Sequence, residues 1–207
     1  MKILITGFEP FGEYPLNPSQ LLVHKLPDQR SHYTLVKDIL PVHHALAPQK
    51  LITLLNEHQP DAVIAFGLAS SRAMISLERV AINLLDYVIP DNAGVTFTNQ
   101  AVVKDGPAAY FSTLPLEHLL TALKDAGIPA ETSLSAGAYL CNQIFYHIMH
   151  KLATENLTIP AGFIHLPALP EQAARSQKPM SSMPFDSLLT AGDIILETVA
   201  KTAFNQS

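Results

Sequence analysis

The stretch Asp61-Ala62-Val63-Ile64-Ala65-Phe66 decides the predicted fold, because five of its six residues are apolar. A strand with one face in water alternates apolar and polar residues, whereas a strand covered on both faces is apolar throughout. The longest apolar run, residues 62–69, contains Gly67 and is far shorter than the roughly 20 residues that a membrane helix needs. We therefore predict a buried parallel strand with helices on both sides.

Further β-rich segments alternate with helical segments along the chain. Expected strands cover residues 2–6, 33–40 and 161–166, a further short strand is expected to close at residues 133–135, and expected helices cover residues 44–59, 116–126, 139–152 and 187–204. Another helix begins at Asn17-Pro18, since asparagine is a common N-cap and proline suits the first helical position. This alternation predicts an α/β protein, a single-domain three-layer α/β/α sandwich over residues 1–207 with a twisted, mostly parallel sheet.

Two segments fall outside this alternation. Residues 95–103 follow a clear turn cluster, Pro90-Asp91-Asn92-Ala93-Gly94, and are expected to form a small β-hairpin arm. Residues 170–185 contain three prolines and are expected to form an irregular loop.

Composition excludes several classes of protein. The 207 residues carry a net charge of −5, which argues against nucleic acid or an anionic membrane as a partner. Charged residues make up 15%, below the usual share of about 25%, so part of the surface is expected to be covered in an oligomer. One cysteine excludes an intramolecular disulfide and a cysteine-rich zinc site. The short apolar run at the N-terminus is no signal peptide, so we expect a cytoplasmic protein.

The single cysteine, Cys141, follows the small residues Ser135-Ala136-Gly137-Ala138. Such residues allow a strand to turn sharply into a helix, which would place Cys141 in the first helical turn. There the helix dipole favours a thiolate, and free backbone N–H groups can hold an oxyanion. The alternative is a buried core residue, because Phe145 lies four residues on, along the same helical face.

His165 is the best-placed base for such a nucleophile. It ends an apolar strand, and functional groups of open parallel sheets gather at the carboxyl ends of strands. Glu78 is a carboxylate in an otherwise apolar segment, and it requires a partner if buried. It could orient a histidine or pair with another cation, just as His165 could be a hydrogen-bonded core residue. No metal is expected, since His147 and His150 have no completing cluster.

The loop after the first strand reads Gly7-Phe8-Glu9-Pro10-Phe11-Gly12. It lacks the glycine spacing of a dinucleotide site and the Gly-Lys-Ser/Thr of a phosphate loop, so we expect no nucleotide cofactor. Two phenylalanines at the end of a strand suit a flat, weakly polar ligand. The alternative is that they only cap the core.

Together these segments resemble the pyroglutamyl peptidase I (pyrrolidone-carboxylate peptidase) family. The matching segments, in family order, are residues 6–12 (TGFEPFG), 17–19 (NPS), 78–83 (ERVAIN), 90–92 (PDN), 136–137 with 141–142 (AG and CN), and 162–165 with 169–172 (GFIH and LPEQ). They extend from the first residues to beyond residue 170, and they are specific jointly rather than singly.

The resemblance implies a cytosolic cysteine peptidase that removes the N-terminal pyroglutamyl residue from peptides through a thioacyl intermediate. It implies no cofactor, pyroglutamylated peptides as partners and, often, a homotetramer. Carried over by motif, Cys141 is the nucleophile, His165 the base and Glu78 the group that orients His165.

The resemblance also implies a pocket for the lactam ring. Its walls would be Phe8 and Phe11 on one side and Tyr139 and Leu140 on another. The buried lactam N–H and C=O each need a partner, because an orphaned group costs about 1–3 kcal/mol. Asn17 and backbone groups near Leu68 are the candidates for this pairing.

The sequence departs from the family pattern at three places. Val88 stands where the family usually has an arginine, residues 67–72 contain serines where glycines are common, and Ala138 replaces a threonine. Loss of one electrostatic donor lowers a rate by about 100-fold. Two alternatives therefore stay open: a weak or inactive homologue that binds pyroglutamyl peptides, and an amidohydrolase that acts on another acyl group.

Overall fold

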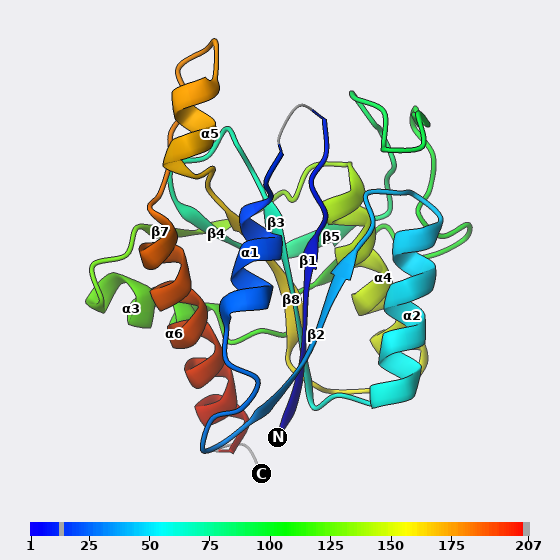
Figure 1. Cartoon of the computed structure of the whole chain (residues 1–207). Helices are drawn as coiled ribbons and strands as arrows, with labels where there is room; N and C mark the ends of the chain where they lie inside the picture. Colours follow the sequence, from blue (N-terminus) through cyan, green and yellow to red (C-terminus); the bar gives the residue numbers. More distant parts are fainter. Residues whose placement is uncertain (13–14, 205–207) are drawn as a thin grey trace.

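The fold is built on one mixed sheet of six strands, in the order β2-β1-β3-β8-β4-β7 (Figure 1). The computed structural model describes residues 1–12 and 15–204. The strands are β1 (Lys2–Phe8), β2 (Thr34–Leu40), β3 (Ala62–Leu68), β4 (Ile75–Glu78), β7 (Ala130–Ser133) and β8 (Ala161–Leu166). Strands β1, β2, β3 and β8 are parallel to one another, while β4 is antiparallel to β8. The predicted mostly parallel sheet is confirmed.

Helices cover both faces of this sheet, as predicted. On one side lie α1 (Pro18–Lys25), α3 (Leu116–Asp125) and α6 (Phe185–Phe204), and on the other lie α2 (Leu46–His58) and α4 (Leu140–Thr154) (Figure 1). The apolar β3 supplies both layers, because its side chains alternate between the faces. Ile64 and Phe66 belong to one hydrophobic cluster, and Val63 and Ala65 belong to the other.

The start of α1 follows the sequence-based prediction closely. Asn17 has an extended backbone and accepts a hydrogen bond from the Ser19 N–H, and Pro18 occupies the first turn. A proline loses nothing at this position, because the first N–H groups of a helix have no intrahelical acceptor. None of the described helices is long and apolar enough to cross a lipid bilayer.

The predicted hairpin arm over residues 95–103 is wrong. The small antiparallel pair consists instead of β5 (Val80–Ile82) and β6 (Ala109–Phe111), and the predicted arm contributes only a single bridge, from Gln100 to Leu85. At its two ends the backbone N–H groups find side-chain acceptors rather than a neighbouring strand: Asp91 accepts from Val95, and Asn83 accepts from Val103.

The segment after β8 is also more regular than predicted. Within residues 170–185, expected as an irregular loop, the structure forms the short helix α5 (Pro170–Arg175). Pro170 begins the helix, and the Gln172 side chain accepts a hydrogen bond from the Leu169 N–H. This helix stands at the same end of the molecule as the loop that follows β1 (Figure 1). The last residues of the expected domain, 205–207, lie outside the described residues.

Candidate active site

Strand register brings Glu78 and His165 together. Glu78 ends β4 and pairs with Phe163 of β8, so that Glu78, Phe163 and His165 point to the same face of the sheet. The Glu78 Oε1 atom lies 2.7 Å from Nδ1 of His165, and both side chains are buried. An ionised carboxylate only accepts hydrogen bonds, so Nδ1 carries the proton and Nε2 keeps its lone pair.

Cys141 approaches the same region from α4. The helix begins at Leu140, which places Cys141 in the first turn, as predicted. Its Sγ atom lies against Gly67 of β3, where an added Cβ would be only 2.8 Å from the sulfur. Gly67 is the register partner of His165 on the neighbouring strand. The structure therefore brings the cysteine, the histidine and the carboxylate to one end of the sheet.

Burial and charge set the protonation states of the carboxylate and the imidazole. Burial opposes ionisation of Glu78, but the hydrogen bond and charge of His165, the nearby Ser133 hydroxyl and the Arg72 cation outweigh it and lower its pKa. Burial also lowers the pKa of His165, more than Glu78 raises it, and Arg72 adds to the lowering. The resting site thus holds an ionised carboxylate and a neutral imidazole.

The thiol differs from the sequence-based expectation. Burial raises the pKa of Cys141 to about 12, and the negative charge of Glu78 adds to this, while Arg72 and the Cys141 N–H act in the opposite direction. The expected resting thiolate is therefore wrong, because desolvation outweighs the helix dipole. The sulfur rests as a thiol, and its proton must leave as the sulfur attacks.

A small pocket of about 40 Å³ opens beside the sulfur. It is lined by Phe8, Phe11, Asn17, Val42, Leu68, Tyr139, Leu140 and Cys141. All six residues predicted to contact the substrate thus lie in one pocket with Cys141. Val42 was not predicted, because it follows β2 and carries no chemical signal. Sites for drug-sized ligands span about 300–1,000 Å³, so this pocket suits one small group.

The hydrogen bonds of Asn17 restrict what it can offer a ligand. Its Oδ1 accepts from both the N–H and the hydroxyl of Ser19, at 3.0 and 2.8 Å. Its Nδ2 donates to the Glu9 carbonyl at 3.1 Å. An asparagine amide has two N–H donors, so one donor is left over while the acceptor is fully engaged.

Hydrogen bonds from neighbouring loops hold the tyrosine side of the pocket. The Tyr139 hydroxyl donates to the Pro90 carbonyl at 3.2 Å, and the Tyr139 ring contacts Tyr87 with centroids 4.5 Å apart. The Tyr87 hydroxyl donates to Gln143 of α4 at 2.6 Å. Neither Tyr87 nor Gln143 was predicted from the sequence, because no local pattern links residues so far apart in the chain. Val88, which stands where the family pattern has an arginine, is 96% exposed.

A second group of side chains near this wall has metal-ligand chemistry. Ligand atoms of His43, His44 and Asp91 lie within 4.8 Å of one another. The Asp91 carboxylate, however, already accepts hydrogen bonds from the His44 ring and from the N–H groups of His44, Ala93 and Val95. We therefore interpret Asp91 as the residue that organises this turn.

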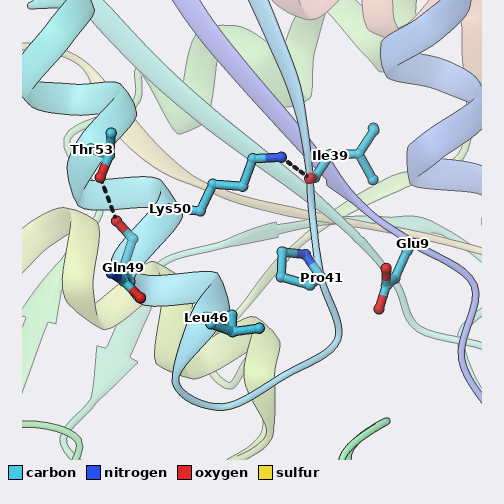
Figure 2. A pocket seen from close by; sticks show the side chains of 7 residues that line it. All are labelled: Glu9, Ile39, Pro41, Leu46, Gln49, Lys50 and Thr53. Carbon is cyan, nitrogen blue, oxygen red and sulfur yellow. Dashed lines mark hydrogen bonds between the residues drawn. The ribbon is translucent and has the colours of Figure 1, made fainter.

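Another pocket lies between the end of β2 and the start of α2 (Figure 2). Lys50 donates there to the Ile39 carbonyl at 2.9 Å and pairs with Asp38, and Glu9 accepts from the Val42 N–H. These charges are engaged in holding the loops, and the pocket contains none of the predicted site residues.

A cysteine and a carboxylate-paired histidine at one end of an α/β sheet are typical of cysteine hydrolases. Within this class, the profile of the pyroglutamyl peptidase family matches residues 1–202. The chain belongs to the pyroglutamyl peptidase family.

Individual relatives agree with this assignment. A pyrrolidone-carboxylate peptidase of Thermococcus onnurineus is 42% identical over 201 residues, covering 97% of this chain and 100% of that protein. One of Pseudomonas fluorescens is 46% identical over 189 residues, covering 90% and 87%. A mutant pyrrolidone carboxyl peptidase of Pyrococcus furiosus superposes with a TM-score of 0.95 at 37% identity, covering 98% and 99%. Pyroglutamyl peptidase I of Bacillus amyloliquefaciens gives 0.92 at 37%, covering 96% and 94%.

Proposed function

We propose that this protein is a cysteine peptidase that hydrolyses the amide bond after an N-terminal pyroglutamyl residue. The observation that carries the proposal is the position of Cys141, which lines a small, mostly apolar pocket and lies against Gly67, the register partner of the His165 that pairs with Glu78. Membership of the pyroglutamyl peptidase family supports the same activity. So do relatives named pyrrolidone-carboxylate peptidase.

In the first half of the proposed reaction, the Cys141 sulfur attacks the pyroglutamyl carbonyl carbon and its proton passes to Nε2 of His165. The carbonyl oxygen becomes an oxyanion near the start of α4, where the Tyr139 side chain provides no cap and backbone N–H groups are available. One such donor stabilises a transition state by about 3–4 kcal/mol. The C–N bond then breaks, and Nε2 returns the proton to the leaving amine.

The second half releases the acyl group. A water molecule gives a proton to Nε2 of His165 and attacks the thioester carbon. The C–S bond breaks, the sulfur recovers the proton from Nε2, and pyroglutamic acid leaves. Glu78 keeps Nδ1 protonated throughout, so the same nitrogen, Nε2, exchanges the proton in every step.

The pocket accounts for the preference for pyroglutamate over an ordinary N-terminal residue. Pyroglutamate is a neutral lactam, whereas a free N-terminus carries an ammonium group whose burial without a partner is costly. The walls formed by Phe8, Phe11, Leu68 and Leu140 offer no such partner. The spare Asn17 donor suits the lactam C=O, so the lactam N–H needs a backbone acceptor, for which the chain near Leu68 is our candidate.

A fluorogenic assay tests the proposal. Reduced protein is expected to release aminomethylcoumarin from its pyroglutamyl derivative, whereas the Cys141→Ser variant is expected to release none. Prolyl and glutaminyl derivatives serve as controls, since a pocket that needs the lactam should reject both. Equal rates for the native protein and Cys141→Ser would contradict the proposal. Equal rates on all three derivatives would favour a less specific amidohydrolase.

A homologue that only binds pyroglutamyl peptides is not favoured. The departures at Val88 and at residues 67–72 leave Cys141, His165 and Glu78 in place. Calorimetric titration with a pyroglutamyl peptide, together with the cleavage assay, would separate the two functions. Tight binding without turnover would favour a binding protein, whereas slow Cys141-dependent cleavage is incompatible with binding alone.

The proposal extends to assembly and location. The exposed apolar side chains of Val88, Ile89, Phe111 and Leu134 support a homo-oligomer, a tetramer by family resemblance. Light scattering on the purified protein measures this mass. A free, functional thiol favours the reducing cytoplasm as the location.

A further inference from the structure

The loop between β3 and β4 brings a cation, Arg72, into contact with the buried site. Its Nη1 donates to Oε1 of Glu78 at 2.6 Å, and its Nη2 donates to the Ser135 carbonyl at 2.6 Å. We propose that Arg72 is a positioning residue, which fixes the Glu78 carboxylate toward His165 and ties the segment before Cys141 to that carboxylate. The inference rests on the proposed function, because it concerns the machinery of the same reaction.

One carboxylate oxygen serves both partners. Oε1 of Glu78 accepts from Nδ1 of His165 at 2.7 Å and from Arg72 at 2.6 Å, while Oε2 accepts no hydrogen bond from any described residue. The nearby Ser133 hydroxyl donates instead to the Ser135 carbonyl. A carboxylate held by one bond can turn about its last torsion, whereas two donors from different directions fix which oxygen faces the imidazole.

The planar guanidinium makes the second contact possible. Its fork of N–H groups reaches two acceptors at once, which a lysine ammonium cannot do with the same geometry. Ser135 lies six residues before Cys141, in the segment that leads from β7 into α4. The same side chain therefore joins the support of the base to the segment that carries the nucleophile. The Arg72 side chain is only 24% exposed and Glu78 is fully buried, so this is no solvated surface pair.

The Arg72 charge also acts on the two groups that exchange the proton. It lowers the pKa of both His165 and Cys141, whereas Glu78 raises both. The charged groups that act on the imidazole are Glu78 from β4 and Arg72 from the loop, while β3 contributes Gly67, which does not titrate and lies against the Cys141 sulfur. Tyr87 and Tyr139 also face the thiol. Removing Arg72 should therefore raise the pKa of His165 and of the thiol.

The test compares Arg72→Gln and Arg72→Lys with the native protein in kcat and KM over about pH 5–9. The glutamine variant should lose roughly tenfold or more in kcat, with KM changed less than about threefold, and the acid limb of its profile should move to higher pH. The lysine variant keeps the charge, so its acid limb should stay in place while kcat recovers only in part.

Arg79→Gln is the matched control. Arg79 follows Glu78 in the chain and is exposed, so the variant removes the same charge from outside the buried site. Its profile should match that of the native protein. If Arg72→Gln loses kcat equally at every pH and its acid limb does not move, the role of Arg72 is merely structural. An effect of Arg72→Gln on KM alone would also overturn the inference.

A second measurement needs no substrate. The rate at which iodoacetamide alkylates Cys141 follows the thiolate fraction, so Arg72→Gln should react more slowly than native protein at each pH. An unchanged rate would overturn the electrostatic part of the inference. If the glutamine variant does not fold, Arg72→Lys tests the inference. Native kcat in the lysine variant would show that the forked N–H groups of the Arg72 guanidinium are not needed. Native protein without pyroglutamyl hydrolysis would overturn the proposed function, and the alkylation rates would still report on Arg72.

Discussion

Glu78 contacts the His165 imidazole from a position further inside the sheet than His165 itself. Strand β4 is antiparallel to β8, so Glu78, the last residue of β4, pairs with Phe163, two residues before His165. The Oε1–Nδ1 distance is 2.7 Å, and the Glu78 side chain is completely buried. This direction of β4 places the carboxylate further inside the sheet, where it is fully buried, while His165 lies nearer the end of its strand.

Replacing Glu78 by glutamine preserves the size of the side chain and removes its charge. We expect kcat to fall on the order of 100-fold or more, because an amide does not hold the imidazole tautomer and leaves Arg72 without its counter-ion. The acid limb should move to lower pH, since Glu78 raises the pKa of His165 in the native protein. Steady-state kinetics over pH measures both effects, and retention of most of the native kcat would exclude Glu78 as the orienting group.

The native pH–rate profile should have its acid limb below the ordinary imidazole pKa of about 6.5. Burial lowers the pKa of His165, and the rate falls as pH drops through that value, because a protonated imidazole no longer accepts the thiol proton. The thiol itself, with a pKa of about 12, should cause no loss at neutral pH. A flat profile of kcat/KM would contradict the role of His165.

Gly67→Ala should abolish turnover with little change in the rest of the fold. The added Cβ would lie 2.8 Å from Sγ of Cys141 and 2.7 Å from the Phe163 ring, so the sulfur must move. Gly162→Ala is the control, because its Cβ would meet Ser112 and Leu114 instead. We expect the control to lower thermal stability while its folded fraction keeps its kcat. Native kcat in Gly67→Ala would show that the sulfur position is not critical.

The two phenylalanines of the pocket should respond differently to truncation. Phe8 is 3% exposed and packs on Phe163, so Phe8→Ala should destabilise the protein by about 3–5 kcal/mol. Phe11 is partly buried and contacts Tyr139, so Phe11→Ala should mainly raise KM. Denaturant unfolding and steady-state kinetics separate the two effects. An unchanged KM in Phe11→Ala would remove Phe11 from the substrate pocket.

Asp91 should contribute stability that depends on pH. Burial opposes its ionisation, but hydrogen bonds from His44, Val95 and Ala93 outweigh it and lower its pKa to about 2. Because this lies below the unfolded value near 4, the contribution, about 2 kcal/mol, is present above about pH 4 and is lost as pH falls toward 2. Unfolding of Asp91→Asn against native protein should show a difference at pH 7 that shrinks on acidification. A constant difference would contradict this linkage.

Local sequence predicted the kinds of elements and their approximate places. The apolar residues 62–66 indicated a strand covered on both faces, and Asn17-Pro18 marked the start of α1. Local patterns failed where side chains replace backbone pairing, as Asp91 does for the predicted hairpin arm, and where a proline begins a helix rather than breaking one, as Pro170 does in α5. The reversed direction of β4 has no local signal, because strand order depends on which apolar faces pack together.

The candidate site divides in the same way. Residue types and family motifs singled out Cys141, His165 and Glu78, since a thiol, an imidazole and a buried carboxylate each carry recognisable chemistry. Only the tertiary structure decided that Glu78 contacts His165 across 87 positions, and that Arg72 contacts both Glu78 and, 63 positions further along the chain from Arg72, Ser135. It also reversed the expected shift of the thiol pKa. The reason is physical: chemistry belongs to a side chain, whereas proximity and desolvation arise only when distant segments pack around it.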